Sequence, residues 1–384
     1  MANLFLVPKK ILSGKDALEN AGPYLRELGS KALIVTDKVM VSTGNVQKLT
    51  TILTGSNISF EVFDGINSEP TTEMVSQGIE FYKKANCDFL IAVGGGSPID
   101  AMKAIGAMIA NAGQLTDYMG KELKNPPPHL VAIPTTAGTG SEATQFTIIS
   151  DTKNNVKMLL KGAILLPSLA IVDPILTVTS PAKVTAATGI DALTHAVEAY
   201  TSRKAQPLSD IFAVSACKRI FANLRTAYNN GLDLNSRNQM ILAALEAGIA
   251  FNNSSVTIVH GMSRPIGALF HVPHGMSNAM LLVECLRFAA AGATERFAEL
   301  AQAVGIAEES LAHEAAAEKL IIEIGGLCRD LSIPTLEAFG VDRAMFDSNL
   351  DKMADDALIS GSPGNTIRQP SKEDMINIYK KLWK

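Results

Sequence analysis

The first half of the chain alternates short apolar runs with helical stretches, and no other feature constrains the fold as strongly. Candidate helices lie near 43–55, 71–85 and 98–112. Around and between them are five runs with the composition of buried strands: KALIVT (31–36), ISFEVF (58–63), DFLIAV (88–93), HLVAI (129–133) and LAIVD (169–173). Strands that are apolar along their whole length, with helices between them, predict a parallel sheet covered on both faces. A hairpin with a polar turn at 151–155 interrupts this pattern.

The pattern changes near Pro181, where strand-like runs largely vanish. Ala-, Leu- and Glu-rich segments with helical spacing follow at 183–201, 207–228, 235–252, 290–304 and 308–330, and SKED (371–374) resembles a capping box that starts a last helix. A chain of 384 residues exceeds the usual size of a single core, so two domains are expected. We place an α/β domain at 1–180 and an all-α domain at 181–384.

Composition excludes several classes of protein. Hydrophobic residues make up 47% and charged residues 19%, which is typical of a globular enzyme and not of a disordered chain. The net charge is −4 with no Lys/Arg-rich run, so we expect neither nucleic acid nor a membrane as a partner. The four cysteines (Cys87, Cys217, Cys285, Cys328) form no CxxC pair and are expected to be reduced thiols. With no signal-peptide pattern or membrane-length apolar run, we expect a cytoplasmic protein.

Two glycine-containing segments follow successive predicted strands. In LIAVGGGSPID (90–100), a strand leads through glycines into a helix, whose N-terminus favours a diphosphate. The segment is not the G-x-G-x-x-G fingerprint, and a simple tight turn remains an alternative. IPTTAGTGSEAT (133–144) supplies hydroxyl groups suited to phosphate, ribose or a nicotinamide amide. Both segments are expected at the carboxyl edge of the sheet, where α/β folds bind ligands.

Asp37 ends the first strong strand, in IVTDKVM. A carboxylate at this position can accept hydrogen bonds from the adenosine ribose and repels a 2′-phosphate, so it would favour NAD over NADP. A helix N-cap is the alternative interpretation of the same residue.

The stretch DALTH (191–195) places Asp191 and His195 one helical turn apart, on one face of a predicted helix. Three of the six histidines fall close together further along, at His260, His271 and His274. One carboxylate with two or three imidazoles suits a divalent first-row metal such as Fe²⁺ or Zn²⁺. A capped or core-satisfied Asp–His pair is the alternative.

Together, GGGSPID, PTTAGTGSEAT, ATGIDALTHAVEAY and the HG and PHGMSNAM segments resemble the iron-containing, or group III, alcohol dehydrogenase family. The resemblance extends over essentially the whole chain. It implies a Rossmann-like N-terminal domain that binds NAD and a helical C-terminal domain that binds one divalent metal. This is the dehydroquinate synthase-like two-domain architecture.

The resemblance also assigns roles to individual residues. The family's metal ligands fall on Asp191, His195, His260 and His274. Its cofactor-binding positions fall on Asp37, Gly94, Gly95, Gly96, Ser97, Thr135, Thr136, Thr139, Thr144 and Lys157, of which Lys157 corresponds to a lysine beside the nicotinamide ribose.

Two positions depart from some relatives. Arg264 stands where many members carry a further histidine, and Glu69 stands where some carry asparagine. Arg264 would lie one helical turn from a metal ligand, so we consider it for substrate contact, with a structural ion pair as the alternative. His271 is the candidate for relaying a proton to solvent.

The expected function is metal-dependent NAD(H) oxidoreduction of a primary alcohol and its aldehyde, with the metal polarising the substrate oxygen. An acidic or hydroxylated aldehyde remains open as the substrate. The alternatives are a superfamily polyol dehydrogenase or lyase, and a non-catalytic nucleotide-binding module. Relatives are commonly dimers, so we expect a homodimer or a larger homo-oligomer. Fe²⁺ is the expected metal, and Zn²⁺ also accepts this ligand set.

Overall fold

The computed structural model describes residues 2–154 and 156–383. These residues form two compact units that divide between Ser180 and Pro181, where the composition changes. Leu6–Ser180 is an α/β unit. The helical unit contains the chain from Pro181 onward and also the N-terminal segment up to Phe5.

A six-stranded sheet forms the centre of the α/β unit. Its strands are β1 (Ile11–Ser13), β2 (Lys31–Val35), β3 (Ser59–Phe63), β4 (Phe89–Gly94), β5 (His129–Pro134) and β8 (Leu169–Val172). Their order is β1-β8-β5-β4-β2-β3, and every neighbouring pair is parallel. The predicted parallel sheet is therefore confirmed. The chain leaves β2 towards one edge and β4 towards the other, so the topological switch point lies between these two strands.

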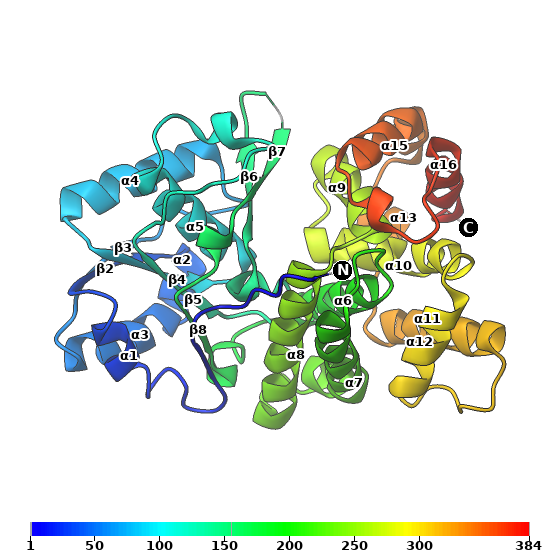
Figure 1. Cartoon of the computed structure of the whole chain (residues 1–384), viewed down its shortest axis with the longest axis horizontal. Coiled ribbons are helices and arrows are strands. Elements are labelled where there is room, and N and C mark those ends of the chain that lie inside the picture. The colour runs from blue at the N-terminus through cyan, green and yellow to red at the C-terminus, as the bar shows by residue number, and fades with distance from the viewer. Residues whose placement is uncertain (1, 155, 384) are drawn as a thin grey trace. The chain divides into compact units, whose positions relative to one another are not determined.

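Alternate side chains of the central strands enter two separate cores. In β4, Leu90 and Ala92 face one core while Phe89 and Ile91 face the other. Helices α4 (Thr72–Ala85) and α5 (Gly96–Ala110) cover the first face, and α1 (Gly22–Arg26) and α3 (Asn45–Gly55) cover the second (Figure 1). Burial of both faces explains why these strands are apolar along their whole length.

The remaining elements of this unit are short. Helix α2 (Lys38–Ser42), α1 and β1 were not predicted, since three to five residues give too little periodicity to detect. The hairpin is confirmed as β6 (Phe146–Asp151) paired antiparallel with β7 (Val156–Lys161). Position 155 of its turn lies outside the described residues.

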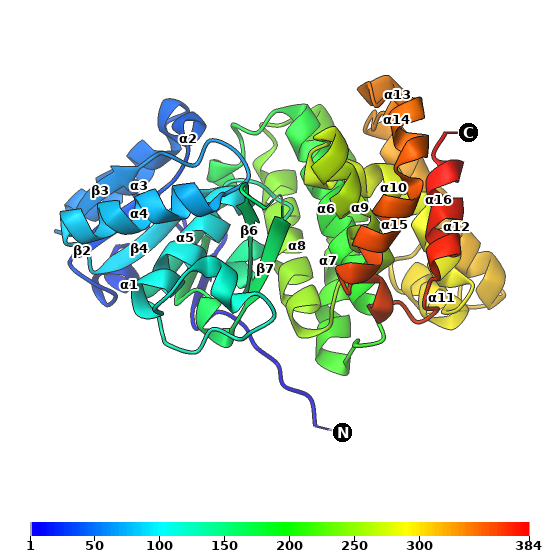
Figure 2. The same cartoon turned by 90° about the horizontal axis from the view of Figure 1, so that it is seen from above.

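The unit that begins at Pro181 is helical throughout its described part. Its helices are α6 (Ala182–Tyr200), α7 (Pro207–Asn229), α8 (Leu234–Asn253), α9 (Ile258–Phe270), α10 (His274–Ala290), α11 (Thr294–Ala303), α12 (His313–Asp330), α13 (Leu336–Phe339), α14 (Arg343–Ser348), α15 (Leu350–Ile359) and α16 (Lys372–Lys381). Helices α6, α7 and α8 pack against one another, as Figure 2 also shows. The predicted capping box is present, because Ser371 and Asp374 exchange side chain-to-backbone hydrogen bonds at the start of α16.

Several helices of this unit were not predicted. Helix α9 contains Pro265, and α10 begins directly at His274 after Pro273, so the prolines hid both helices from periodicity. Among the described residues, no single helix is long and apolar enough to cross a membrane. The bent pair α8 and α9, at 105°, meets that criterion by length and composition alone. All four cysteines are buried free thiols.

Candidate metal centre and cofactor-binding loops

Three helices of the helical unit bring four metal-ligand candidates together. Asp191 and His195 lie on the same face of α6, four residues apart, and both are buried. His260 is the third residue of α9, and His274 is the first residue of α10. Residues distant in sequence therefore meet because α10 packs against both α6 and α9.

The ligand atoms of these residues surround Asp191. Its Oδ1 lies 3.7 Å from His260 Nε2 and 3.8 Å from His274 Nε2, and its Oδ2 lies 4.0 Å from His195 Nδ1. Ligand atoms of Asp191, His195 and His260 all lie within 4.8 Å of one another. The imidazoles of His195 and His260 are stacked, with centroids 4.4 Å apart. One carboxylate and three imidazoles in this arrangement suit Fe²⁺ or Zn²⁺.

Buried polar atoms at this site support the fit to a cation. Asn278, from the PHGMSNAM segment, directs its Nδ2 at Asp191 Oδ1 (2.7 Å), His260 Nε2 (3.1 Å) and His274 Nε2 (3.3 Å). An amide group has only two hydrogens, so it does not donate to all three atoms at once. His195 Nδ1 and Asn278 Oδ1 are buried without a hydrogen-bond partner. The described site thus contains buried polar atoms that its own hydrogen bonds leave unsatisfied.

The electrostatics of the site favour positive charge. Burial lowers the pKa of His195 to about 3, so this imidazole is neutral and its lone pair is available. Burial acts in the same direction on His260, but the carboxylates of Glu198 and Asp191 override it and raise the pKa to about 9. The surroundings of His260 therefore attract a positive charge, the property needed to hold a divalent cation.

Glu198 was not identified from the sequence as part of this site. It lies on α6, seven residues after Asp191 and three after His195, and its carboxylate contacts His260 Nδ1 at 2.6 Å. The spacing Asp-x3-His-x2-Glu on one helical face was the available signal, because i, i+4 and i+7 lie in one stripe. An acid with no obvious partner in an apolar helix indicates a buried role.

In the α/β unit, the predicted diphosphate loop lies at the carboxyl end of β4. Gly94 has φ +154°, and a Cβ there would lie 2.5 Å from Pro98 Cγ. A Cβ on Gly96 would lie 2.9 Å from Thr139 Cγ2. Helix α5 begins here with Gly95 as N-cap, no capping side chain and no acid in its first turn. Its first amides are therefore open to an anion, as a diphosphate requires.

The predicted threonine loop follows β5, the neighbour of β4. The backbone N–H of Thr135 donates to Gly94 O at 2.9 Å, and its buried Oγ1 has no partner. Thr136 and Thr139 face Gly95 and Gly96, since each supplies the nearest atoms to a Cβ built there. Ser97 is half-buried in the first turn of α5. The structure therefore brings the two loops together at one edge of the sheet.

Thr144 occupies a different environment from the other threonines. It is buried, and its Oγ1 lies 3.0 Å from Lys103 Nζ. Lys103 is fully buried on α5 and also donates to the carbonyls of Ser141 (2.6 Å), Thr144 (2.8 Å) and Phe146 (3.0 Å). This lysine, which the sequence did not single out, fastens the threonine loop to α5.

Two acids accompany Lys103. Ser141 Oγ donates to Asp100 Oδ1 at 2.6 Å, and Ile148 N donates to Asp100 Oδ2 at 2.9 Å. Burial raises the pKa of Glu142 to about 7, and burial lowers the pKa of Lys103 to about 8. These residues form a buried charged cluster beneath the threonine loop.

Two other predicted cofactor residues have partners of their own. Asp37 is the N-cap of α2, because its Oδ1 accepts from Met40 N at 2.9 Å. Lys157 forms an ion pair with Glu69, with Nζ 2.6 Å from Oε2. Glu69, which stands where some relatives carry asparagine, therefore contacts the lysine predicted to lie beside the nicotinamide ribose. Their roles in cofactor binding stay predictions.

The two catalytic candidates lie on α9 and at its end. Arg264, one turn after His260, is half-buried and forms no direct hydrogen bond or salt bridge with any described residue. Burial lowers the pKa of Arg264, and the carboxylate of Glu198, acting from a longer distance, opposes this shift. His271 is the exposed C-cap of α9 in a left-handed conformation, with φ +54°.

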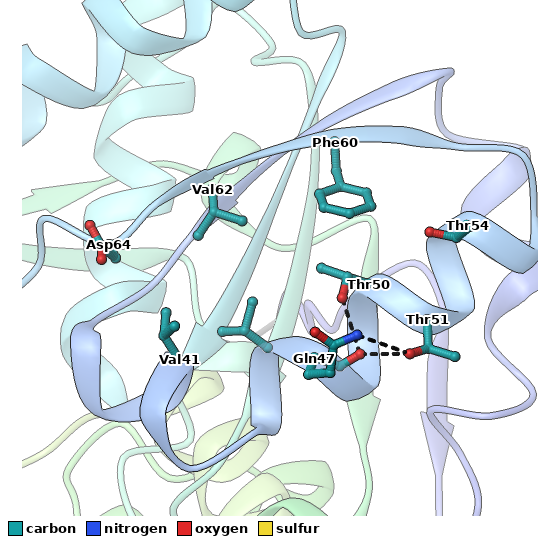
Figure 3. Close-up of a pocket in the computed structure, with 9 residues that line it drawn as sticks. Val41, Gln47, Thr50, Thr51, Thr54, Phe60, Val62 and Asp64 are labelled. Carbon is teal, nitrogen blue, oxygen red and sulfur yellow. Dashed lines mark hydrogen bonds between the residues drawn. The ribbon is translucent and has the colours of Figure 1, made fainter.

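A groove of about 740 Å³ lies elsewhere on the α/β unit (Figure 3). Thr50, Thr51 and Thr54 of α3 line one side, and Phe60 and Val62 of the edge strand β3 line the other. None of the predicted cofactor residues lines this groove. We therefore do not assign the nucleotide to it.

Two family models together match nearly the whole chain. A family model described as iron-containing alcohol dehydrogenase matches residues 8–174, and one described as Fe-containing alcohol dehydrogenase family, C-terminal, matches residues 185–383. The chain belongs to the iron-containing alcohol dehydrogenase family.

Individual relatives agree with this membership. The 1,3-propanediol dehydrogenase of Citrobacter freundii is 40% identical, over 99% of this chain and 98% of that protein. The NAD-dependent methanol dehydrogenase of Bacillus methanolicus is 35% identical, over 99% of each. A crystal structure of a 1,3-propanediol oxidoreductase superposes with a TM-score of 0.96 at 38% identity, covering 100% of both chains.

Membership in the iron-containing alcohol dehydrogenases establishes the class of reaction. This member is an NAD-dependent metal enzyme that interconverts an alcohol and its aldehyde, and its substrate is a small molecule. The predicted family, fold class, cofactor and reaction class are thus confirmed.

Proposed function

We propose that Asp191, His195, His260 and His274 hold the catalytic metal, and that the glycine and threonine loops hold NAD. The observation that carries the proposal is the convergence of three imidazoles on one buried carboxylate, 3.7–4.0 Å from its oxygens. When bound, the metal supplies Lewis-acid polarisation of the substrate oxygen, and the nicotinamide supplies or takes up the hydride. The open backbone amides at the start of α5 support diphosphate binding.

The proposed substrates are short primary alcohols and their aldehydes, among them diols, because relatives named for 1,3-propanediol and methanol cover the whole chain. Fe²⁺ is the proposed metal, and Zn²⁺ fits the same donors. Asp37, at the switch point of the sheet, retains an Oδ2 beyond its capping bond and is proposed to favour NAD over NADP.

The test is initial-rate oxidation of NADH with neutral and acidic short aldehydes. It compares Fe²⁺-loaded, Zn²⁺-loaded and chelator-stripped protein under anaerobic conditions, with NADPH as the second cofactor. Metal-dependent turnover that prefers NADH supports the proposal. Turnover that survives complete stripping contradicts the metal assignment. Absence of net NADH consumption would favour the lyase alternative, because a synthase regenerates its cofactor in each cycle.

A second candidate is reduction of an aldehyde that carries an acidic group. The observation that favours it is Arg264, whose half-buried guanidinium forms no salt bridge with a described residue and has the Glu198 carboxylate as its nearby anion. A cation that has lost part of its hydration and has no direct ion pair gains from a substrate anion. In Arg264→Gln, KM should rise about tenfold or more for acidic aldehydes, and much less for neutral ones. Equal changes for both substrates would remove the case for anion recognition.

His271 is proposed to pass a proton between the substrate region and solvent. Its exposure at the end of α9, three residues before His274, supports exchange with water. The variant His271→Gln should lower kcat with little change in metal content, and added imidazole should restore part of the rate. An unchanged pH–rate profile would show that the histidine carries no proton.

We also propose a homodimer or larger homo-oligomer in the cytoplasm. The family resemblance supports the proposal of an oligomer, because relatives are commonly dimers. Light scattering of the purified protein tests the oligomeric state.

A further inference from the structure

Glu198 is the most completely buried acid beside the proposed metal site, with no exposed surface. An ionised carboxylate in such a place is stable only when hydrogen bonds replace its lost water. Glu198 receives three: from Thr257 Oγ1 at 2.7 Å, from Val259 N at 2.6 Å and from His260 Nδ1 at 2.6 Å. All three donors lie at the start of α9.

One oxygen of Glu198 acts as a cap for α9. Thr257 is the N-cap residue of this helix, yet its own side chain makes no capping bond. Instead, Oε1 of Glu198 accepts from Thr257 Oγ1 and from Val259 N in the first turn. A negative charge at a helix N-terminus is favourable because the first amides point at it. A residue of α6 thus fixes the start of the helix that carries His260.

The other oxygen sets the orientation of the His260 ring. An ionised carboxylate only accepts hydrogen bonds, so Nδ1 must carry the proton in its 2.6 Å contact with Oε2. Nε2 then points at Asp191, 3.7 Å from its Oδ1. His195 differs, because its Nδ1 is buried without any partner.

We infer that Glu198 is a positioning residue that fixes His260 with Nε2 facing the metal, and that metal affinity depends on this contact. The inference rests on the proposed metal site. Hydrogen bonds from a ligand histidine to a carboxylate orient the ring and increase its basicity, and their loss weakens metal binding by about 10–100-fold.

The discriminating variant is Glu198→Gln, which keeps the shape and one oxygen for the cap. Its amide nitrogen would replace Oε2 as a donor facing Nδ1, which would then have to accept. The ring proton would move to Nε2, the atom that the metal needs. Thr257→Val is the matched control, because it removes a hydrogen bond to the same carboxylate and leaves His260 in contact with it.

The measurement is Zn²⁺ affinity of chelator-stripped full-length protein, by competition with a chromophoric chelator. Glu198→Gln should bind Zn²⁺ about 10–100-fold more weakly than the parent, and Thr257→Val within about threefold. NADH affinity, measured by fluorescence, should be unchanged in both. Equal affinity of Glu198→Gln and parent would overturn the inference, as would an equal loss in Thr257→Val. A parent that does not bind Zn²⁺ or Fe²⁺ would instead refute the proposed metal site.

A spectroscopic measurement keeps the inference testable if Glu198→Gln fails to fold. In Zn²⁺-loaded parent protein labelled with ¹⁵N-histidine, the strong bond to Glu198 predicts a downfield Nδ1–H resonance that persists in Thr257→Val. Its absence from the parent would overturn the inference without any substitution of Glu198.

Discussion

The proposed sites of the two units consist of different chemical groups. In the α/β unit, the proposed cofactor loops use backbone and the absence of side chains: Gly94 and Gly96 leave space that a Cβ would fill. In the helical unit, the proposed metal site uses side chains from three helices, centred on Asp191. The first kind of site should fail when atoms are added, and the second when they are removed.

The units also treat buried charge differently. Beneath the threonine loop, Lys103 is surrounded by carbonyl and hydroxyl oxygens and lies near two acids, so charge is largely balanced within the protein. At the proposed metal site, Asp191 is surrounded by imidazoles, and His195 Nδ1 and Asn278 Oδ1 have no hydrogen-bond partner. The cluster around Lys103 therefore contains its own cation, whereas the proposed metal site would receive one from solution.

The largest expected effect follows from removing the central carboxylate. Asp191→Ala should lower kcat by at least about a thousandfold, since Lewis-acid stabilisation amounts to several kcal/mol and each 1.4 kcal/mol is a factor of ten. Elemental analysis should find metal lost, while NADH affinity stays at the parent value. Loss of NADH binding as well would break the separation of the two sites.

Next in size is the removal of the buried cation. Lys103→Met has a similar volume but leaves the half-buried Asp100 and the buried Glu142 without their positive neighbour. The free energy of unfolding should fall by about 3 kcal/mol, because breaking a buried pair leaves an uncompensated charge. Denaturant titration measures the free energy of unfolding. NADH affinity should also weaken, because Lys103 holds the threonine loop against α5. Metal content of the folded protein is the control and should not change.

An effect of similar size is expected from Glu142, but only at high pH. Burial raises the pKa of Glu142 from 4.5 to about 7, so the folded state binds the proton more tightly than the unfolded state. Stability from this group is therefore full below pH 4.5 and declines as pH rises to 7. Glu142→Gln should match the parent near pH 4.5 and exceed its unfolding free energy by about 3 kcal/mol at pH 8. A difference that is independent of pH would contradict the shifted pKa.

The smallest effect tests the backbone site directly. In Gly96→Ala, the new Cβ would lie 2.9 Å from Thr139 Cγ2, so the two loops must separate slightly. NADH affinity should weaken by about tenfold, a cost near 1.4 kcal/mol. Gly55→Ala is the control in the same unit, because a Cβ there meets nothing within 4 Å. If both variants bind NADH equally well, the glycine cradle does not form the cofactor site.

The sequence predicted the elements with regular periodicity and missed those that prolines interrupt. Long buried strands and helices have strong periodicity, so β2, β3, β4, β5 and β8 begin within one residue of their expected positions. Helices α9 and α10 were missed because Pro265 and Pro273 interrupt the pattern. The metal-ligand candidates were found because three of them are histidines, of which the chain has six, and because Asp191 and His195 are one helical turn apart. The structure brings all four together.

The supporting residues were harder to foresee. Lys103 looks like an ordinary helical residue, whereas Glu198 shares a helical face with Asp191 and His195. The roles of both depend on partners 38 to 62 positions away in sequence. Lys103 contacts a loop after the next strand, and Glu198 contacts the start of another helix. Such long-range contacts leave no local periodicity, so a single sequence does not reveal them.

The first residues of the chain affect how the protein can be divided. Phe5 stacks on Phe212 of α7 with centroids 5.8 Å apart, and Gln206 Nε2 donates to Leu4 O at 3.2 Å. The helical unit is therefore discontinuous in sequence, and the chain passes from one unit to the other twice. A fragment that starts at Pro181 would uncover Phe212 and leave the Gln206 amide one acceptor short. Biochemists who want the metal site in isolation should therefore graft residues 2–5 onto that fragment rather than cut at the domain boundary.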